Sequence, residues 1–250
     1  MAIEEVWIDE PGAAFHTLVF RCSDAQHPAV LLLPDAAGLR PSITATASRI
    51  AGWGYHVVLP DFYADLGEPP LNIREVFAHG DDWQRMNRMR ASLTHERIDP
   101  RIVALLKRMG CEPWISSGRL ACIGLSFGGR FALAAAANSQ ISLKLAASIH
   151  GGGLATAAFD SPHLRAPNMS GQIYVAAAES DSQVPPEELQ RLRYALSQAG
   201  RCFEIETFPG TRHGFATPES SAFDAEATAQ LWEAVHAQLD HTLLASEPAA

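Results

Sequence analysis

A serine with small neighbours stands between an apolar run and an alanine-rich run of this 250-residue sequence. Residues 124–129 read Gly-Leu-Ser-Phe-Gly-Gly, so Ser126 is the centre of a Gly-x-Ser-x-Gly pattern. On a tight turn from a strand into a helix, this pattern exposes a nucleophilic hydroxyl, and the helix N-terminus favours developing negative charge. A glycine-rich turn with an incidental serine would have the same local sequence. The motif therefore indicates chemistry only if a base and an acid accompany it.

Two later loops contain an acid and a base in the chain order serine, acid, histidine that α/β-hydrolases use. Asp181 follows the apolar residues 173–177, and His213 follows the next apolar run in a glycine-containing turn. Residues that come directly after strands gather at one edge of an open α/β sheet. A single Asp or His in a loop is usually only solvated, but all three types in this order predict a triad with Ser126. Glu179 is the alternative acid.

Hydrolysis of an ester also requires backbone N–H groups that stabilise the oxyanion. The residue after the nucleophile, Phe127, supplies one such group. The other comes from the turn after an early strand, and residues 33–38, Leu-Pro-Asp-Ala-Ala-Gly, form a suitable turn. An ordinary strand-to-helix connection would have the same composition.

Short apolar runs alternate with longer helical patterns along the chain. Several runs are apolar throughout, which is typical of parallel strands that are covered on both faces. The alternation predicts an α/β fold with a mostly parallel, doubly wound sheet and helices on both faces. The expected strands are residues 16–22, 29–33, 55–59, 120–124, 145–150, 173–177 and 203–207, and the expected helices are about residues 42–52, 97–109, 127–138, 186–199 and 221–244.

Residues 61–93 and 151–171 interrupt this alternation with polar, aromatic and proline-containing sequence of weak periodicity. Loops of this length in a compact domain are often lids or substrate-binding insertions. Neither stretch has the composition of a linker between domains. We therefore expect one domain over residues 1–250, with these two stretches as its insertions.

Aromatic side chains in the first insertion are candidates for the wall of a substrate pocket. They are Phe62, Tyr63, Phe77 and Trp83, and packing beneath a long loop is the alternative interpretation. His150 ends an expected strand at the presumed active edge of the sheet. It either borders the pocket or only makes a turn.

Composition and charge exclude several classes of protein. Hydrophobic residues make up 47% of the chain and charged residues 19%, which is enough apolar surface for a folded core. The 19 basic and 28 acidic residues leave a net charge of −9, which disfavours nucleic acid as a partner. Only two basic residues, Lys107 and Lys144, are lysines, so we expect no membrane partner that depends on a polybasic patch.

Targeting and metal-binding signals are missing from the sequence as well. The N-terminus lacks the basic and apolar regions of a signal peptide, and no apolar stretch approaches the roughly 20 residues that span a membrane. The four cysteines are far apart, which indicates reduced thiols and a cytoplasmic protein. The histidines have no metal-ligand spacing, so we expect neither a metal nor an organic cofactor.

Taken in order, these motifs resemble the dienelactone hydrolase family of α/β-hydrolases. The resemblance rests on residues 33–38, on Leu-Pro-Asp-Phe-Tyr at residues 59–63, on the serine motif, on residues 179–181 and on Pro-Gly-Thr-Arg-His-Gly-Phe at residues 209–215. The serine motif is shared by the whole superfamily, whereas the second and last motifs are more specific. Together they cover about residues 31–215, which is most of the chain.

The resemblance implies that Ala36 supplies the second oxyanion N–H and that Asp35 matches a family carboxylate beside the nucleophile. Two positions differ from the family pattern. The named dienelactone hydrolases have a cysteine at Ser126, and Thr217 stands where they have an arginine that holds the substrate carboxylate. Arg85 lies in a segment comparable to the one that carries their other substrate-binding arginine. The resemblance thus implies ester or lactone hydrolysis, on a substrate other than dienelactone.

We expect a serine hydrolase that cleaves a small carboxylic ester or lactone through an acyl-serine intermediate, as a monomer or small homo-oligomer. One alternative is a catalytically idle scaffold that binds a small ligand or a partner protein. A pure binder has no need of all three triad residues, which speaks against this alternative. A thioesterase or a peptidase is the other alternative, although 250 residues leave little room for the added domain that peptidases of this fold usually need.

Overall fold

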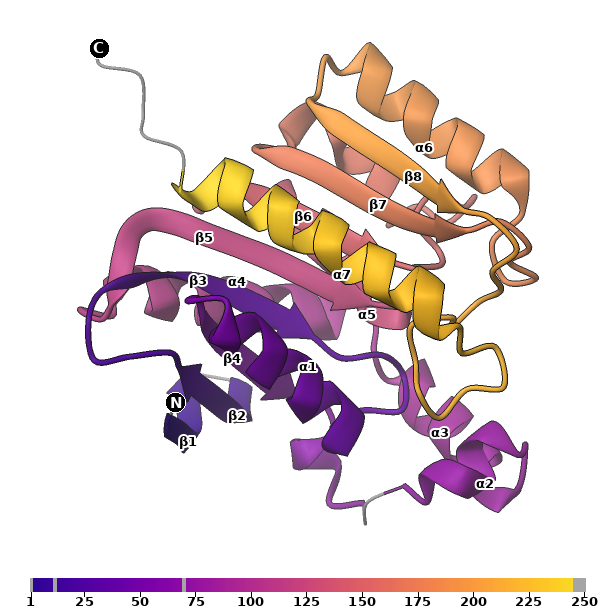
Figure 1. The fold of residues 1–250 in the computed structure, drawn as a ribbon, viewed down its shortest axis with the longest axis horizontal. Helices are drawn as coiled ribbons and strands as arrows, with labels where there is room; N and C mark the ends of the chain where they lie inside the picture. The colour runs from indigo at the N-terminus through magenta and orange to yellow at the C-terminus, as the bar shows by residue number, and fades with distance from the viewer. Residues whose placement is uncertain (1, 11–12, 69–70, 245–250) are drawn as a thin grey trace.

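The computed structural model describes residues 2–10, 13–68 and 71–244. Its strands form one eight-stranded sheet in the order β1-β2-β4-β3-β5-β6-β7-β8 (Figure 1). The pairs from β4 to β8 are parallel, whereas β1 and β2 form an antiparallel edge. The strands are β1 (Ala2–Glu10), β2 (Ala13–Arg21), β3 (His27–Leu33), β4 (His56–Asp61), β5 (Ile115–Leu125), β6 (Leu145–Ile149), β7 (Gln172–Ala178) and β8 (Phe203–Phe208).

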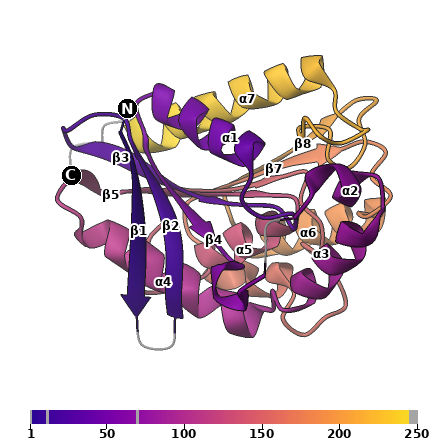
Figure 2. The same ribbon diagram turned by 90° about the horizontal axis from the view of Figure 1, so that it is seen from below.

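Helices cover both faces of this sheet, as the apolar strands require (Figure 2). Side chains alternate along a strand, so Leu31 and Leu33 of β3 pack in one core and Val30 and Leu32 pack in the other. The helices of the first core are α4 (His95–Cys111), α5 (Phe127–Ala136) and α6 (Pro186–Gln198), and those of the second are α1 (Pro41–Gly52) and α7 (Ala225–Leu239). The predicted α/β architecture is therefore confirmed.

The last helix begins later than the sequence pattern predicts. We expected it from residue 221, but α7 begins at Ala225 because the side chain of Asp224 accepts a hydrogen bond from the Ala227 N–H at 2.9 Å. An acidic N-cap of this kind satisfies a backbone donor that has no partner inside the helix. At its other end α7 continues into η3 (Asp240–Leu244).

The two stretches that we expected as long loops contain short helices. Residues 61–93 form η1 (Ala64–Leu66), α2 (Ile73–Phe77) and α3 (Asp81–Ala91), and residues 151–171 contain η2 (Pro162–Asn168). The pattern of α3 is weak because only Met86 and Met89 are buried on an otherwise polar helix. Strand β1 was also missed, since it lies at the sheet edge and pairs only with β2.

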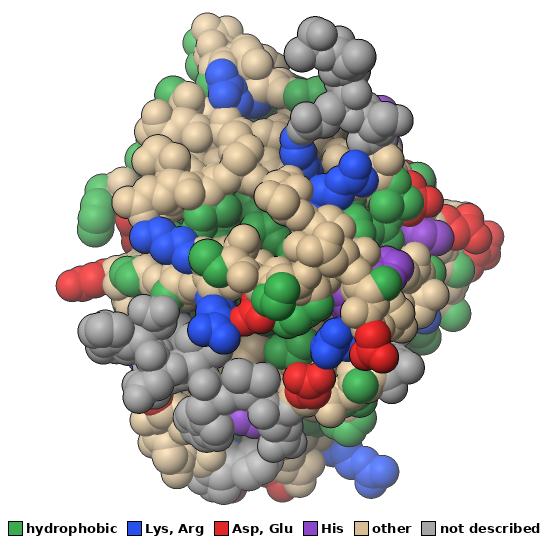
Figure 3. All heavy atoms as spheres, turned by 90° about the vertical axis from the view of Figure 1, so that its left-hand side faces the viewer, with side chains coloured by type: hydrophobic (Ala, Val, Ile, Leu, Met, Phe, Trp, Pro, Cys, Tyr) green, Lys and Arg blue, Asp and Glu red, His purple; other side chains and the backbone are tan. Residues whose placement is uncertain are grey.

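Side chains of both charges lie on the face of the molecule at the amino ends of the parallel strands. On the face shown in Figure 3, basic and acidic side chains are interspersed with polar and apolar ones. Within the described ranges, none of the helices combines the length and the apolar character that a bilayer crossing needs.

Candidate active site

Ser126 lies at the sharp turn between β5 and α5, at the carboxyl end of the sheet. Its φ of 47° and ψ of −113° are strained for a residue with a side chain. The turn can form because its neighbours are glycines: a Cβ atom at Gly124 would lie 2.2 Å from the carbonyl oxygen of Gly128, and a Cβ atom at Gly128 would lie 2.6 Å from that of Pro34. Close packing of the backbone at this turn therefore requires glycine at both positions.

The loops after β7 and β8 bring two further groups to this serine. The Oγ of Ser126 lies 2.9 Å from Nε2 of His213, and Nδ1 of the same imidazole lies 2.8 Å from Oδ2 of Asp181. The Asp181 side chain is 4% exposed and the His213 side chain 15%, so the chain of hydrogen bonds is largely shielded from solvent. Glu179 instead accepts a hydrogen bond from the Gly210 N–H at 2.8 Å.

Backbone contacts hold the acidic loop and the histidine loop together. The Ser180 N–H donates to the carbonyl of Thr211 at 2.9 Å, which ties one loop to the other. The second carboxylate oxygen of Asp181 accepts the N–H of Gln183 at 2.8 Å. The carboxylate is therefore oriented from both sides, with one oxygen left for the imidazole.

A cavity of about 790 Å³ opens above Ser126 and His213, and we call it the Ser126 cavity. Its apolar wall comes from α2 and α3, and its polar wall comes from the loops after β6, β7 and β8. The apolar wall contains Val76, Phe77, Trp83 and Met86, and the polar wall contains His150, Ser180, Ser182, Gln183 and Thr217.

The residues expected to provide the oxyanion N–H groups both line this cavity. Phe127 is the first residue of α5, where backbone N–H groups have no partner inside the helix. Ala36 belongs to the turn after β3, and its carbonyl accepts a hydrogen bond from the hydroxyl of Tyr63 at 3.0 Å. The Tyr63 hydroxyl therefore stabilises the turn that contains Ala36.

Asp35 lines the cavity, but both of its carboxylate oxygens are engaged. They accept two hydrogen bonds from the guanidinium of Arg40 at 2.7 and 2.6 Å, and one of them also accepts the Ala37 N–H at 2.9 Å. Arg40 also lies 3.5 Å from a carboxylate oxygen of Glu219. Asp35 therefore shapes the turn that carries Ala36.

Some of the remaining residues that we predicted for the pocket line it, and others do not. His150, Thr217, Phe77 and Trp83 line the Ser126 cavity, whereas among the described lining residues Tyr63, Arg85 and Phe62 are missing. Phe62 packs in the core, and Tyr63 lies beneath the Ala36 turn. Arg85 is on α3, where it pairs with Asp82 at 3.3 Å.

Three arginines in the wall of the cavity were missed by the sequence analysis: Arg90, Arg130 and Arg212. The guanidinium groups of Arg90 and Arg130 lie 5.6 and 5.4 Å from the centroid of the Phe127 ring. Arg130 lies in the first turn of α5, four residues after Ser126, and both residues line the cavity. That spacing was the available signal for Arg130, whereas Arg90 depends on the fold of residues 61–93.

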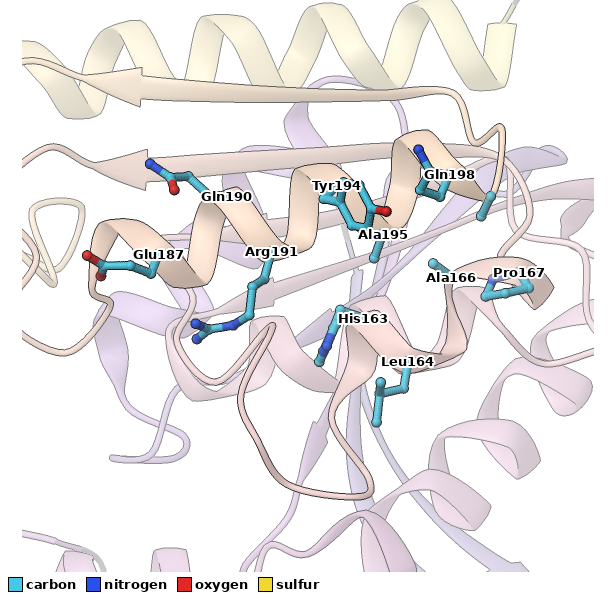
Figure 4. Close-up of a pocket in the computed structure, with 11 residues that line it drawn as sticks. His163, Leu164, Ala166, Pro167, Glu187, Gln190, Arg191, Tyr194, Ala195 and Gln198 are labelled. Carbon is cyan, nitrogen blue, oxygen red and sulfur yellow. The ribbon is translucent and has the colours of Figure 1, made fainter.

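A second hollow, of about 690 Å³, lies between α6 and η2 (Figure 4). Its described lining residues include His163, Arg191 and Tyr194, and none of the predicted site residues is among them. In the described ranges, no group of three or more His, Cys, Asp or Glu side chains is arranged to hold a metal ion. Of these two hollows, the Ser126 cavity is the one that Ser126 and His213 line.

Known proteins are similar to this chain in sequence and in fold. The model of the dienelactone hydrolase family matches residues 15–243. Hydrolase pyvD of Aspergillus violaceofuscus is 27% identical over 197 residues, which cover 76% of this chain and 70% of the relative. The carboxymethylenebutenolidase homolog of Homo sapiens is 24% identical over 189 residues, which cover 75% of this chain and 70% of the relative.

A solved structure of similar fold is that of a dienelactone hydrolase-like promiscuous phosphotriesterase from metagenomic libraries. It aligns with a TM-score of 0.80 at 19% identity and covers 96% of this chain and 98% of its own. This likeness confirms the predicted α/β-hydrolase fold.

Proposed function

Because the chain belongs to the dienelactone hydrolase family, we propose that it hydrolyses small carboxylic esters or lactones through an acyl-serine intermediate on Ser126. The observation that carries this proposal is the continuous hydrogen-bond chain from Ser126 through His213 to Asp181, at 2.9 and 2.8 Å. A serine, an imidazole and a carboxylate in this geometry form the machinery of acyl transfer.

In the first half of the proposed reaction, Nε2 of His213 takes the proton from the Ser126 hydroxyl as the oxygen attacks the ester carbonyl. Asp181 accepts the Nδ1–H, holds the imidazole in this tautomer and stabilises the imidazolium. The oxyanion is held by the N–H groups of Phe127 and Ala36. Collapse breaks the bond to the alkoxy oxygen, which leaves with the proton from His213.

In the second half, His213 takes a proton from water, and the resulting hydroxide attacks the acyl-serine carbonyl. The second tetrahedral intermediate expels the Ser126 oxygen, which recovers its proton from His213. A lactone follows the same steps, except that its alcohol remains part of the acyl group, so that attack by water releases a single hydroxy acid.

The walls of the Ser126 cavity support an ester or lactone that also carries an anionic group. The cavity is lined by Arg90, Arg130 and Arg212. Asp35 is the one carboxylate among its described lining residues, and Arg40 already binds it. The site is therefore locally basic in a chain of net charge −9. A basic cleft attracts anionic substrates. The name carboxymethylenebutenolidase, which a relative carries, likewise denotes a carboxylate-bearing lactone.

We propose that α2 and α3 act as a substrate-binding cap on a single-domain enzyme. They contribute the apolar wall, and their own small core of Val76 and Met86 packs against Ala37 of the oxyanion turn.

All four cysteines are free thiols, which supports a reducing compartment such as the cytoplasm.

Turnover of 4-nitrophenyl acetate and of dihydrocoumarin, a lactone, tests this function. We expect hydrolysis of both by the wild type and a loss of at least about 10³-fold in Ser126→Ala, since loss of the catalytic serine lowers kcat about 10⁶-fold in a serine protease. A thioester and a peptide substrate are measured in parallel. Unchanged turnover in Ser126→Ala would exclude Ser126 as the nucleophile, and a dominant thioester rate would favour a thioesterase.

The charge of the substrate is tested with an aryl ester that ends in a carboxylate and with its methyl-capped counterpart. We expect a kcat/KM about tenfold higher for the anionic ester, with the advantage reduced in Arg130→Gln and at high salt. Arg193→Gln, on the solvated face of α6, is the matched control. Equal rates for the two esters would contradict an anionic substrate.

A further inference from the structure

The imidazole of His150 lies beside the proposed triad but does not belong to it. His150 directly follows β6, the strand next to the one that ends at Ser126, and it lines the Ser126 cavity. Its ring centroid lies 5.5 Å from that of His213, at 75° between the planes. Its φ of 39° is in the left-handed region that most side chains avoid. Backbone strain of this kind persists where the surroundings enforce it, and it is frequent at functional sites.

The hydrogen bonding of His150 is incomplete within the described structure. The residue is 2% exposed, and its Nδ1 is buried with no partner among the described residues. A buried polar atom without a partner is uncommon and calls for an explanation. Because Nδ1 is enclosed, Nε2 is the ring nitrogen that remains to face the cavity.

The surroundings keep this imidazole neutral. Burial, and to a smaller extent the nearby His213, lower the pKa of His150 to about 4, although the Asp35 and Asp181 carboxylates act in the opposite direction. A neutral imidazole has one N–H group. A proton on Nδ1 would be an enclosed donor without an acceptor, whereas a proton on Nε2 can be used at the cavity that His150 lines, so the proton belongs on Nε2. His150 thus presents a neutral N–H donor to the cavity.

We propose that His150 Nε2–H donates a hydrogen bond to an oxygen atom in the acyl part of the substrate, beside the scissile carbonyl, and so determines specificity. The acyl part is the relevant one because His150 stands next to the strand end whose serine would carry the acyl group. The substrate class is then an ester or lactone with a second oxygen close to its carbonyl. This inference rests on the proposed function.

Isosteric substrate pairs isolate this hydrogen bond. In 4-nitrophenyl methoxyacetate an oxygen replaces one CH₂ group of 4-nitrophenyl butanoate, and 4-nitrophenyl 3-methoxypropanoate is matched in the same way with the pentanoate. The readout is the ratio of kcat/KM within each pair, compared between wild type and variant. The comparison with the wild type cancels the intrinsic reactivity of the esters and any general loss of activity.

Three variants at His150 distinguish the effect of its Nε2–H donor from the effect of its size and shape. A glutamine amide nitrogen can take the position of Nε2, whereas the amide of asparagine reaches only the position of Nδ1 and leucine has no donor. We expect His150→Leu and His150→Asn to lower the ether-to-alkyl ratio about tenfold in at least one pair, and His150→Gln to keep most of it. An unchanged ratio in the Leu and Asn variants, or a Gln variant no better than Asn, would overturn the inference.

Labelling of Ser126 with a fluorophosphonate separates this inference from the proposed function. Absence of labelling in the folded wild type would refute the function, whatever the ester ratios are. Labelling of the wild type and of the His150 variants with unchanged ratios would refute only the role of His150. If the Leu variant does not fold, the comparison of the Gln and Asn variants decides.

Discussion

Asp181 and Glu179 lie two residues apart, and the structure gives them different partners. Asp181 binds the imidazole of His213 at 2.8 Å, while Glu179 binds the Gly210 backbone at 2.8 Å. The sequence placed both after the same strand and favoured Asp181 but left Glu179 as the alternative, because the choice depends on how the loop turns after β7. Arg90 of the cavity wall was missed for a related reason, since its position over the Phe127 ring depends on how α3 packs against α5.

The first residue-scale prediction compares these two acids. We expect Asp181→Asn to lower kcat about 10³- to 10⁴-fold, since an amide in this place favours the wrong imidazole tautomer. Glu179→Gln should stay within about threefold of the wild type, because an amide oxygen still accepts the Gly210 N–H. Steady-state hydrolysis of 4-nitrophenyl acetate measures both. A larger loss in Glu179→Gln than in Asp181→Asn would reverse the assignment.

The second residue-scale prediction concerns pH and stability. The pKa of His150 is about 4 in the folded chain, against about 6.5 for an unfolded histidine. The unfolded state therefore binds more protons between these values, and stability falls as the pH drops from about 6.5 towards 4. A difference of about 2.5 pKa units corresponds to at most about 3 kcal/mol. The folded state keeps this contribution in full above pH 6.5.

Replacing His150 removes the group whose lowered pKa makes the stability of the fold depend on pH in this range. We expect the melting temperature of His150→Leu to fall less between pH 7.5 and pH 5 than that of the wild type. His241→Leu, at an exposed position, is the control and should keep the wild-type slope. The same slope in all three proteins would show that His150 is not buried as a neutral group.

At the scale of elements, the central strands and most of the helices follow directly from the sequence. β3, β6, β7 and the second half of β5 are apolar because they are covered on both faces, and such runs can be recognised without tertiary information. The missed elements have a weaker signal. β1 is an edge strand, and α3 buries only two methionines, so contacts with the rest of the fold determine both.

The turn at Ser126 gives a prediction about an element boundary. We expect Gly124→Ala to destabilise the fold strongly, because its Cβ would lie 2.2 Å from the carbonyl oxygen of Gly128. Gly110→Ala in α4 is the matched control, since nothing lies within 4 Å of its Cβ position. Alanine in a helix is favoured over glycine by up to about 1 kcal/mol, so this control should be slightly stabilised. Thermal melts of both variants check the pair, and a neutral Gly124→Ala would contradict the described packing.

At the scale of the whole molecule, a buried arginine joins the two halves of the site. Arg40 has a side chain that is 2% exposed, and it pairs with Asp35 of the oxyanion turn and with Glu219 beyond the histidine loop. The resemblance of the sequence to a family indicated Asp35 alone. The partnership with Glu219 was not predictable, because it spans two loops that meet only in the folded sheet.

Removing this arginine should destabilise the whole fold. Arg40→Met leaves the buried Asp35 carboxylate without its partner, a change that costs about 3–5 kcal/mol. We expect a melting temperature lower by about 10 °C, since each kcal/mol shifts a chain of this size by roughly 2–4 °C. Arg108→Met, which breaks an exposed pair with Glu112, should change little. Equal melting temperatures for the two variants would show that the buried ion pair is not a structural tie.

The central claim is that Ser126 is an activated nucleophile. Its most direct test is reaction of the protein with a fluorophosphonate probe and mapping of the adduct by mass spectrometry, with His213→Ala as the control. The account predicts one adduct, on Ser126, that disappears in the folded control. A folded wild-type protein that forms no adduct, or forms it equally in His213→Ala, would contradict the claim.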